Sequence, residues 1–299
     1  ILAMPVAFKN AGTVVGVIGT VLLGYICTHC VYLLVKVSQD VSKVSKVPSL
    51  GYAETLEAVV ATGPRPFRKF SRGARIFIDW AMALTILGAC AVYVILLVES
   101  VKQVSFANIL LVATFAICLY YICKDFPSLD SRPMSIDIAR LPLFIGTVIF
   151  AMEGIGVVLP VENTMAKPQH FLGCPGVLNF TMLVVVLLYM IMGFLGYIKY
   201  GDEAFGSITL NLPTNEMLVI FVITSTLPKL EQVIGLEGAF FYSFLGLIAP
   251  SLMEIMFLWN RGLGKYNWIL IKDSLLAIFG GFVLITGCMQ SIREIIRTK

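Results

Sequence analysis

Apolar runs of membrane-spanning length alternate with short polar stretches along the chain. A helix that crosses a bilayer needs about 20 mostly apolar residues. Five runs of about this length contain no Asp, Glu, Lys or Arg, and they cover residues 10–35, 80–98, 103–123, 168–198 and 274–292. Two further runs, 141–161 and 233–259, are apolar apart from Glu153 in the first and Glu237 and Glu254 in the second. The pattern predicts seven spanning helices, and therefore an all-α, polytopic transmembrane helical bundle.

The composition excludes the main classes of soluble protein. Hydrophobic residues make up 58% of the chain and charged residues 13%, against about 45–50% and about 25% in soluble domains. An ordinary soluble enzyme and a disordered chain are therefore excluded, and the lipid bilayer is the expected environment. No separable soluble domain interrupts the apolar runs, so residues 1–299 are interpreted as a single transmembrane domain.

The distribution of charge predicts which side one loop occupies. Between Lys36 and Arg75 the chain has eight Lys or Arg residues against three acidic ones, whereas its total net charge is only +4. Basic residues in short loops stay on the cytoplasmic side of a membrane. We therefore predict a cytoplasmic loop at about 37–75. A nucleic-acid-binding patch is disfavoured, because membrane spans flank the loop on both sides, and we expect no nucleic acid as a partner.

The run 141–161 contains the strongest candidate for a functional site, because Glu153 in its middle is followed by Gly154 and Gly156. A carboxylate near the bilayer centre costs on the order of 2–3 kcal/mol, so it is expected to face a cavity or a partner. The two glycines allow the helix to unwind. Unwound backbone is tolerated at this depth only inside protein or beside an aqueous site. Its freed N–H and C=O groups suit the carboxylate and the ammonium of an amino acid.

The residues leave one alternative open for this run, a kinked helix in which Glu153 is structural. A second interrupted segment lies at the start of the chain, where Pro5, Lys9, Asn10 and Gly12 close a short apolar run. Paired interrupted segments in separate halves of a membrane protein point to a transporter site. The pair favours the functional interpretation of Glu153.

Six motifs spread along the chain carry a resemblance to a known family. They are LAMPVAFKNAG at 2–12, CTHC at 27–30, PSLGY at 48–52, FAMEGIGVVLPVEN at 150–163, GSITLNLP at 206–213 and APSLME at 249–254. In this order they are similar to proton-coupled amino acid transporters of the amino acid/auxin permease family, and the insect-type members resemble the chain most. The resemblance covers nearly the whole chain.

The resemblance implies both a fold and a site. The fold is a LeuT-like inverted-repeat bundle of the amino acid-polyamine-organocation type, with about eleven spans, whose first and sixth helices are broken around a central substrate site. The implied substrate-binding residues are Leu2, Ala3 and Met4 after the first break, Phe150, Ala151, Met152, Gly154 and Gly156 at the second, and Tyr93 on the third helix. An ordinary core tyrosine is the alternative for Tyr93. Glu153 is the candidate for proton coupling, with the proton as the coupling ion and no other cofactor.

The chain departs from the family at two places. The fourth and eighth spans have no counterpart, and the expected positions of these missing spans are near 104/105 and 217/218. The fold is therefore expected to be incomplete. Two lost crossings would invert spans five to seven, including the segment around Glu153, relative to the family. A chain shortened in this way need not transport anything.

Other reactive or ionisable residues give weaker signals. Asp79, Glu99 and Glu254 lie close to the ends of apolar runs, and we expect them at the membrane boundary. The CTHC motif is compatible with redox chemistry or a metal site, but no second pair of ligands with suitable spacing accompanies it. We therefore predict no metal site.

The leading hypothesis from the sequence is a secondary transporter of small neutral amino acids, coupled to protons and working by alternating access around the two broken helices. The rival hypothesis is a regulatory or amino-acid-sensing membrane protein, or a shortened isoform that is inactive in transport. An intramembrane enzyme is disfavoured, because the motifs of such enzymes are absent from the sequence. The sequence is compatible with the plasma membrane and with a lysosomal or endosomal membrane.

Overall fold

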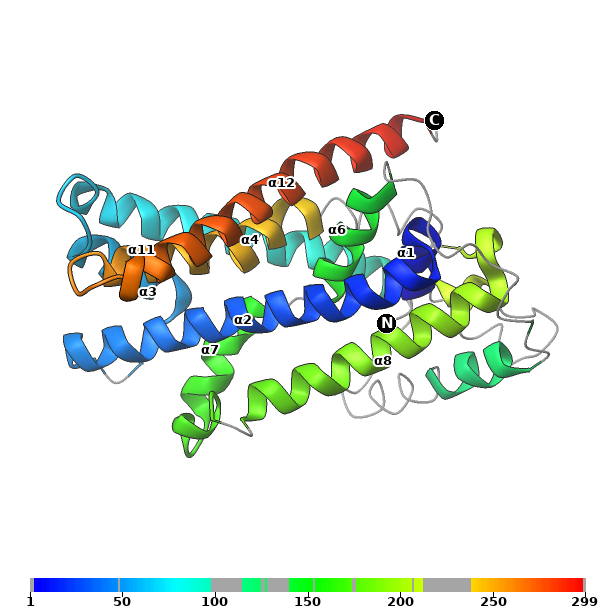
Figure 1. Ribbon diagram of the computed structural model, residues 1–299, viewed down its shortest axis with the longest axis horizontal. Helices are drawn as coiled ribbons and strands as arrows, with labels where there is room; N and C mark the ends of the chain where they lie inside the picture. The colour runs from blue at the N-terminus through cyan, green and yellow to red at the C-terminus, as the bar shows by residue number, and fades with distance from the viewer. Residues whose placement is uncertain are drawn as a thin grey trace.

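The computed structural model describes residues 3–47, 49–97, 115–124, 127, 140–152, 154–173, 176–205, 207–211 and 238–297, and all regular structure in these ranges is helical. The prediction of an all-α bundle is therefore confirmed. The main helices are α1 (Met4–Ala11), α2 (Thr13–Ser45), α3 (Tyr52–Thr62), α4 (Ser71–Leu97), a short helix at 115–123, α6 (Leu141–Ala151), α7 (Ile155–Thr164), α8 (Val177–Tyr200), the π-helix η7 (Gly238–Ile248), α11 (Ala249–Leu258) and α12 (Trp268–Arg297). The longest of them run roughly along the long axis of the molecule (Figure 1).

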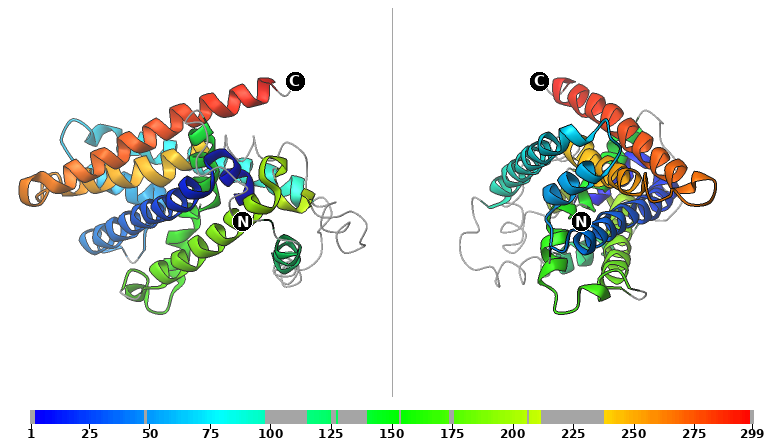
Figure 2. Two further views of the ribbon diagram at one scale, coloured as in Figure 1. Left: turned by 45° about the vertical axis from the view of Figure 1, so that its right-hand side comes forward. Right: turned by 90° about the vertical axis from the view of Figure 1, so that its left-hand side faces the viewer.

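Five helical segments of the described chain are long and apolar enough to cross a membrane. They are Thr13–Ser45, Leu141–Thr164, Val177–Glu203, Gly238–Leu258 and Lys265–Arg293. Each contains most of one predicted run. The run 80–98 forms the second part of α4, and only the part of 103–123 that forms the short helix at 115–123 lies within the described residues. In both views of Figure 2, α12 lies along one edge of the bundle.

Small residues hold α1 tightly against its neighbours. Gly12, with φ 84°, turns the chain between α1 and α2. The ring of Phe8 lies so close to Gly16 of α2 and Gly193 of α8 that a Cβ atom added to either glycine would come within 2.6 Å and 2.5 Å of it, respectively. Close packing of this kind is how helices associate in lipid, where burial of apolar surface provides little driving force. The helix α1 therefore packs beside the start of α2 and the end of α8, as Figure 1 shows.

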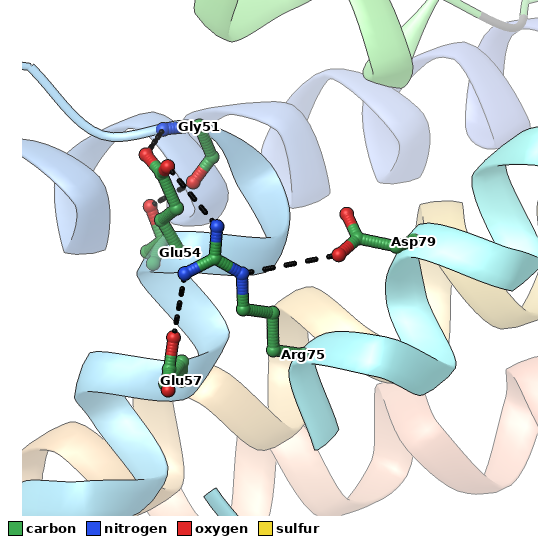
Figure 3. Close-up of polar contacts among 6 residues, drawn as sticks. Gly51, Glu54, Glu57, Arg75 and Asp79 are labelled. Carbon is green, nitrogen blue, oxygen red and sulfur yellow. Dashed lines mark hydrogen bonds and ion pairs between the residues drawn. The ribbon is translucent and has the colours of Figure 1, made fainter. Parts of the chain in front are cut away.

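The basic segment at 37–75 is largely helical. It consists of the last turns of α2, the helix α3 and the start of α4. Figure 3 shows Arg75 of α4 facing α3, where its guanidinium lies 3.0 Å from Glu57 and 3.5 Å from Glu54. The hydrogen bond to Glu57 raises the pKa of Arg75 above its usual value. These contacts are exposed, so they position α3 beside α4 without adding much stability. The cytoplasmic location of the segment stays a prediction.

The far end of the Glu153 segment lies beside the basic segment, and its expected inversion relative to the family stays a prediction. At the far end of α7, Gln39 of α2 donates a hydrogen bond to Glu162 (2.8 Å), and the amide of Asn163 donates one to the carbonyl of Leu50 (3.3 Å). The segment therefore ends at the same end of the bundle as the basic segment.

Candidate functional site

The run around Glu153 forms two helices instead of one. The first, α6, ends at Ala151, and α7 begins at Ile155. Met152 has φ −92° and ψ 9°, and Gly154 has φ 175° and ψ 1°, so neither continues the helix. The interruption that the sequence predicts is therefore present, between residues 151 and 155. Glu153 itself lies outside the described residues.

Backbone groups that a continuous helix would pair face the interruption from both sides. The last carbonyl of α6, on Ala151, accepts a hydrogen bond of 2.5 Å from the hydroxyl of Tyr189 on α8. On the other side, Gly154 provides no side-chain cap for α7. The N–H of Val157 donates a hydrogen bond to the carbonyl of Gly154 (3.0 Å). The N–H groups at the start of α7 form the positive end of its dipole. The two half-helices thus present acceptors and donors to the same gap.

A small cavity lies beside the interruption. It is about 20 Å³ in volume and is lined by Cys27, Val31, Ile149, Met152, Gly154, Ile155, Tyr242, Gly246 and Leu247. A volume of this size holds about one water molecule. Its walls come from α2, from η7 and from the two half-helices. In this conformation the site is closed, so an amino acid can enter only if these walls separate.

The wall formed by η7 packs directly on α6. A Cβ atom added to Gly238 would lie 2.3 Å from the carbonyl oxygen of Gly146, so only glycine permits this approach. Further along, the ring of Tyr242 lies 5.6 Å from that of Phe150, measured between centroids. Turns of π-helix are frequently found at functional sites. The close contact brings Tyr242 to the interruption.

Most of the predicted residues of the second break lie at this site. Met152 and Gly154 line the cavity, Ala151 presents its carbonyl and Phe150 contacts the π-helix. Gly156 lies one residue into α7, where an added Cβ atom would lie 3.6 Å from the Met82 side chain of α4. These positions are compatible with the predicted roles, which remain untested.

The predicted residues outside the second break are less closely connected with the cavity. Met4 is completely buried in the same hydrophobic cluster as Met152, and Ala3 precedes α1. Leu2 lies outside the described residues, as does the side chain of Tyr93. The backbone of Tyr93 is eleven residues beyond Met82 on α4, which is about 16 Å along a helix axis. The roles of these residues stay predictions.

Sequence reasoning missed several residues of the site. Tyr189 and Tyr242 lie inside apolar runs, where a tyrosine hydroxyl needs a hydrogen-bond partner, and that requirement is the one signal that could have identified them. Val31 carried no signal, and Cys27 was singled out only as part of the CTHC motif.

The side chain of Glu254 is buried and forms an ion pair with Lys272, and that of Asp79 is 59% exposed. Their expected place at the membrane boundary stays a prediction. Glu99 and Glu237 lie outside the described residues.

Comparison with known proteins identifies a family. A family model described as "Transmembrane amino acid transporter protein" matches residues 1–131 and 104–223. The Drosophila melanogaster protein named "Proton-coupled amino acid transporter-like protein pathetic" is 31% identical over 387 aligned positions, which cover 99% of this chain and 82% of the relative. The Caenorhabditis elegans protein named "Probable amino acid transporter skat-1" is 21% identical over 398 positions, covering 99% and 86%. No solved structure matches the chain.

The lengths of these alignments carry a further finding. The alignment to the Drosophila protein has 387 positions and the chain has 299 residues, a difference of 88. At least 88 positions of that alignment are therefore gaps in this chain. The predicted locations of the two missing spans stay predictions.

Proposed function

The chain belongs to the family of transmembrane amino acid transporter proteins, and from that premise we propose that it carries small neutral amino acids across a membrane together with protons. The protein is thus an integral membrane protein with several spans, and the family is one of transporters, so the expectation that it is not an enzyme is confirmed. The observation that carries the proposal is the interruption between α6 and α7. It gives a backbone site for the two charged ends of an amino acid.

The two half-helices bind the two ends of the substrate differently. The carboxylate of the amino acid accepts hydrogen bonds from the N–H groups at the start of α7, where the helix dipole favours negative charge. Its ammonium group donates to the carbonyls at the end of α6, in competition with Tyr189. Because the cavity has room for about one water molecule, its walls have to move apart before any amino acid can bind.

Alternating access follows from the arrangement of the broken helices. In the LeuT-like arrangement that the resemblance implies, α1 is the second half of the first broken helix, and it packs against α6. Rocking of these paired half-helices against the rest of the bundle would open the cavity to each side in turn. Glu153, between the half-helices, takes up the coupling proton when the site faces the outside and releases it inside.

Uptake by the purified full chain in liposomes tests this proposal. Glycine, alanine or proline is expected to accumulate when the outside is acidic, and Glu153→Gln is expected to remove the dependence on the proton gradient. Glu162→Gln is the matched control. It makes the same chemical change at the far end of α7, where Glu162 accepts a hydrogen bond from Gln39 and does not face the interruption. Coupled uptake that persists in Glu153→Gln removes Glu153 from the mechanism, and a wild type without uptake of any of the three rejects the transport proposal.

One observation favours a second candidate function. At least 88 alignment positions of the Drosophila relative are gaps in this chain, and a bundle that lacks helices can bind a substrate without alternating access. A sensor or a transport-inactive isoform would then result. Binding of labelled amino acid to the reconstituted protein without uptake supports this function, whereas uptake excludes it.

A further inference from the structure

Three charged residues lie together in the apolar part of the bundle, away from the interrupted helix. Glu254 belongs to α11, and Lys272 and Asp273 belong to the first turns of α12. Both helices lie in segments that are apolar enough to span a membrane. We refer to Glu254, Lys272 and Asp273 as the charged triad.

The ammonium group of Lys272 is the centre of the triad. Its nitrogen lies 2.8 Å from a carboxylate oxygen of Glu254 and 3.0 Å from one of Asp273. A third contact, of 3.1 Å, joins it to Nε2 of His29 on α2. An ammonium group has three protons to donate. Its contacts with Glu254 and His29 are hydrogen bonds, whereas its contact with Asp273 is an ion pair without hydrogen-bond geometry. For Nε2 to accept, the imidazole of His29 has to be neutral with its proton on Nδ1.

The triad has more negative than positive charge in a buried place. Side chains of Glu254 and Asp273 are 6% and 0% exposed. Two carboxylates on one ammonium leave a net charge of −1 when all three are ionised, and two like charges near the same cation repel each other. Glu254 receives a hydrogen bond from Lys272, whereas neither oxygen of Asp273 receives one from a described residue. Asp273 is therefore the less stabilised carboxylate.

The other ionisable groups around the triad do not neutralise it. Cys30 and Lys36 are its further neighbours on α2, and Lys36 acts on His29 more than on the carboxylates. On α3, the hydroxyl of Tyr52 donates its hydrogen bond to the carbonyl of Leu245. The excess negative charge thus stays with the carboxylate pair.

The triad is attached to the same helices that form the walls of the small cavity. Cys27 and Val31 of α2 line that cavity and are each two residues from His29, about half a turn. The helix α11 continues directly from η7, which contributes Tyr242 and Gly246 to the cavity. A change of charge in the triad therefore acts on two of the cavity walls. His29 also lines a second cavity, of about 430 Å³, between α2 and α8.

We propose that the charged triad is a proton-binding site in which Asp273 carries the proton, and that its protonation sets how tightly α2, α11 and α12 hold together during transport. The proton adds to a carboxylate oxygen of Asp273 and comes from the aqueous phase. The charge of the triad changes from −1 to zero, and release of the proton to water reverses the step. The coupling to transport rests on the proposed function, whereas the binding of the proton does not.

The site lies near the end of the bundle that carries the basic segment. Glu254 is four residues from the end of α11, and α11 packs against α3. If the basic segment is cytoplasmic, the triad is on the cytoplasmic side of the substrate cavity. The triad then releases its proton to the cytoplasm, and its charge returns to −1.

Infrared difference spectroscopy of the full chain in liposomes tests the proton-binding site directly. Acidification of the wild type is expected to produce a C=O band at the high frequency of a carboxylic acid in apolar surroundings, and Asp273→Asn is expected to lose it. The matched control is Asp202→Asn, which removes a carboxylate that is exposed at the end of α8 and should leave the band unchanged. A band that persists in Asp273→Asn overturns the inference.

A second variant keeps the test decisive if Asp273→Asn does not fold. In Glu254→Gln, Lys272 neutralises Asp273 alone, so the band at the same pH is expected to weaken strongly. An unchanged band in this variant also overturns the inference.

Transport assays on the same liposomes test the coupling separately. In Asp273→Asn, exchange of labelled for unlabelled alanine is expected to continue while stimulation of uptake by a proton gradient is lost. If a proton gradient stimulates uptake by Asp273→Asn as much as uptake by the wild type, the role of the triad in coupling is rejected. The infrared experiment then decides whether the triad binds a proton. If the wild type shows neither exchange nor uptake, the proposed function fails while the infrared result still decides on the proton site.

Discussion

The contact between η7 and α6 gives the sharpest prediction about what holds the candidate site together. Gly238 touches the backbone of α6 next to the interruption, and we consider its replacement by alanine. The added methyl group would lie 2.3 Å from the carbonyl oxygen of Gly146 and 2.8 Å from Cβ of Phe150. The first of these atoms belongs to the backbone of a helix, so it cannot rotate away. The helix α6 has to move instead, and Phe150 moves with it.

The expected cost follows from the size of the overlap. Overpacking by one methyl group in a well-packed interior typically costs about 1–3 kcal/mol. Alanine also gains up to about 1 kcal/mol over glycine in a helix, which would hide part of that loss. Gly246→Ala on the same π-helix corrects for this gain, because a Cβ atom there meets no other atom within 4 Å. The difference between the two variants should therefore report the overlap alone.

Thermal unfolding in detergent, followed by fluorescence or by loss of monomer in size-exclusion chromatography, measures the difference. With about 2–4 °C per kcal/mol for chains of 150–250 residues, Gly238→Ala is expected to melt about 2–12 °C below Gly246→Ala. Equal or higher stability of Gly238→Ala would refute the reasoning, since it would mean that η7 does not lie against the backbone of α6.

Three further predictions concern other contacts. Tyr189→Phe removes the hydrogen bond to Ala151 and is expected to cost about 0.5–1.5 kcal/mol of stability in the same melting assay; an unchanged melting temperature would contradict that bond. Arg75→Gln removes the ion pairs between α3 and α4, so chymotryptic cleavage between these helices should speed up at low salt, with a smaller effect at high salt; equal rates would show that the pairs do not hold α3. In a cysteine-free background, Lys46→Cys and Asp202→Cys should react with impermeant maleimide from opposite sides of the membrane, and labelling from the same side would contradict the fold.

Much of the architecture could be predicted from the apolar runs. A run of about 20 residues without charge has one stable arrangement in a bilayer, because every backbone group must be paired within the segment. The interruption near Glu153 was also predictable. Its carboxylate is costly to place near the bilayer centre, and the two glycines beside it weaken the helix at that point. The structure has the first residue of the break at Met152, two residues before the first glycine of the pair.

Contacts between distant parts of the chain could not be predicted in the same way. His29, Glu254 and Lys272 meet although more than 200 residues separate the first from the other two. The sequence places Glu254 near the end of an apolar run, which is equally compatible with an exposed carboxylate and with a buried ion pair. Only the packing of α2, α11 and α12 distinguishes these alternatives.

By itself, the sequence determined that the chain is a helical membrane protein and where one of its helices breaks, because both properties depend on the local balance between apolar surface, charge and backbone flexibility. The tertiary structure decided which groups share a cavity. Gly238 lies against Gly146, and Tyr189 caps Ala151. Such pairings depend on the angles and distances at which helices pack, and these are set by many small contacts that no single stretch of the chain contains.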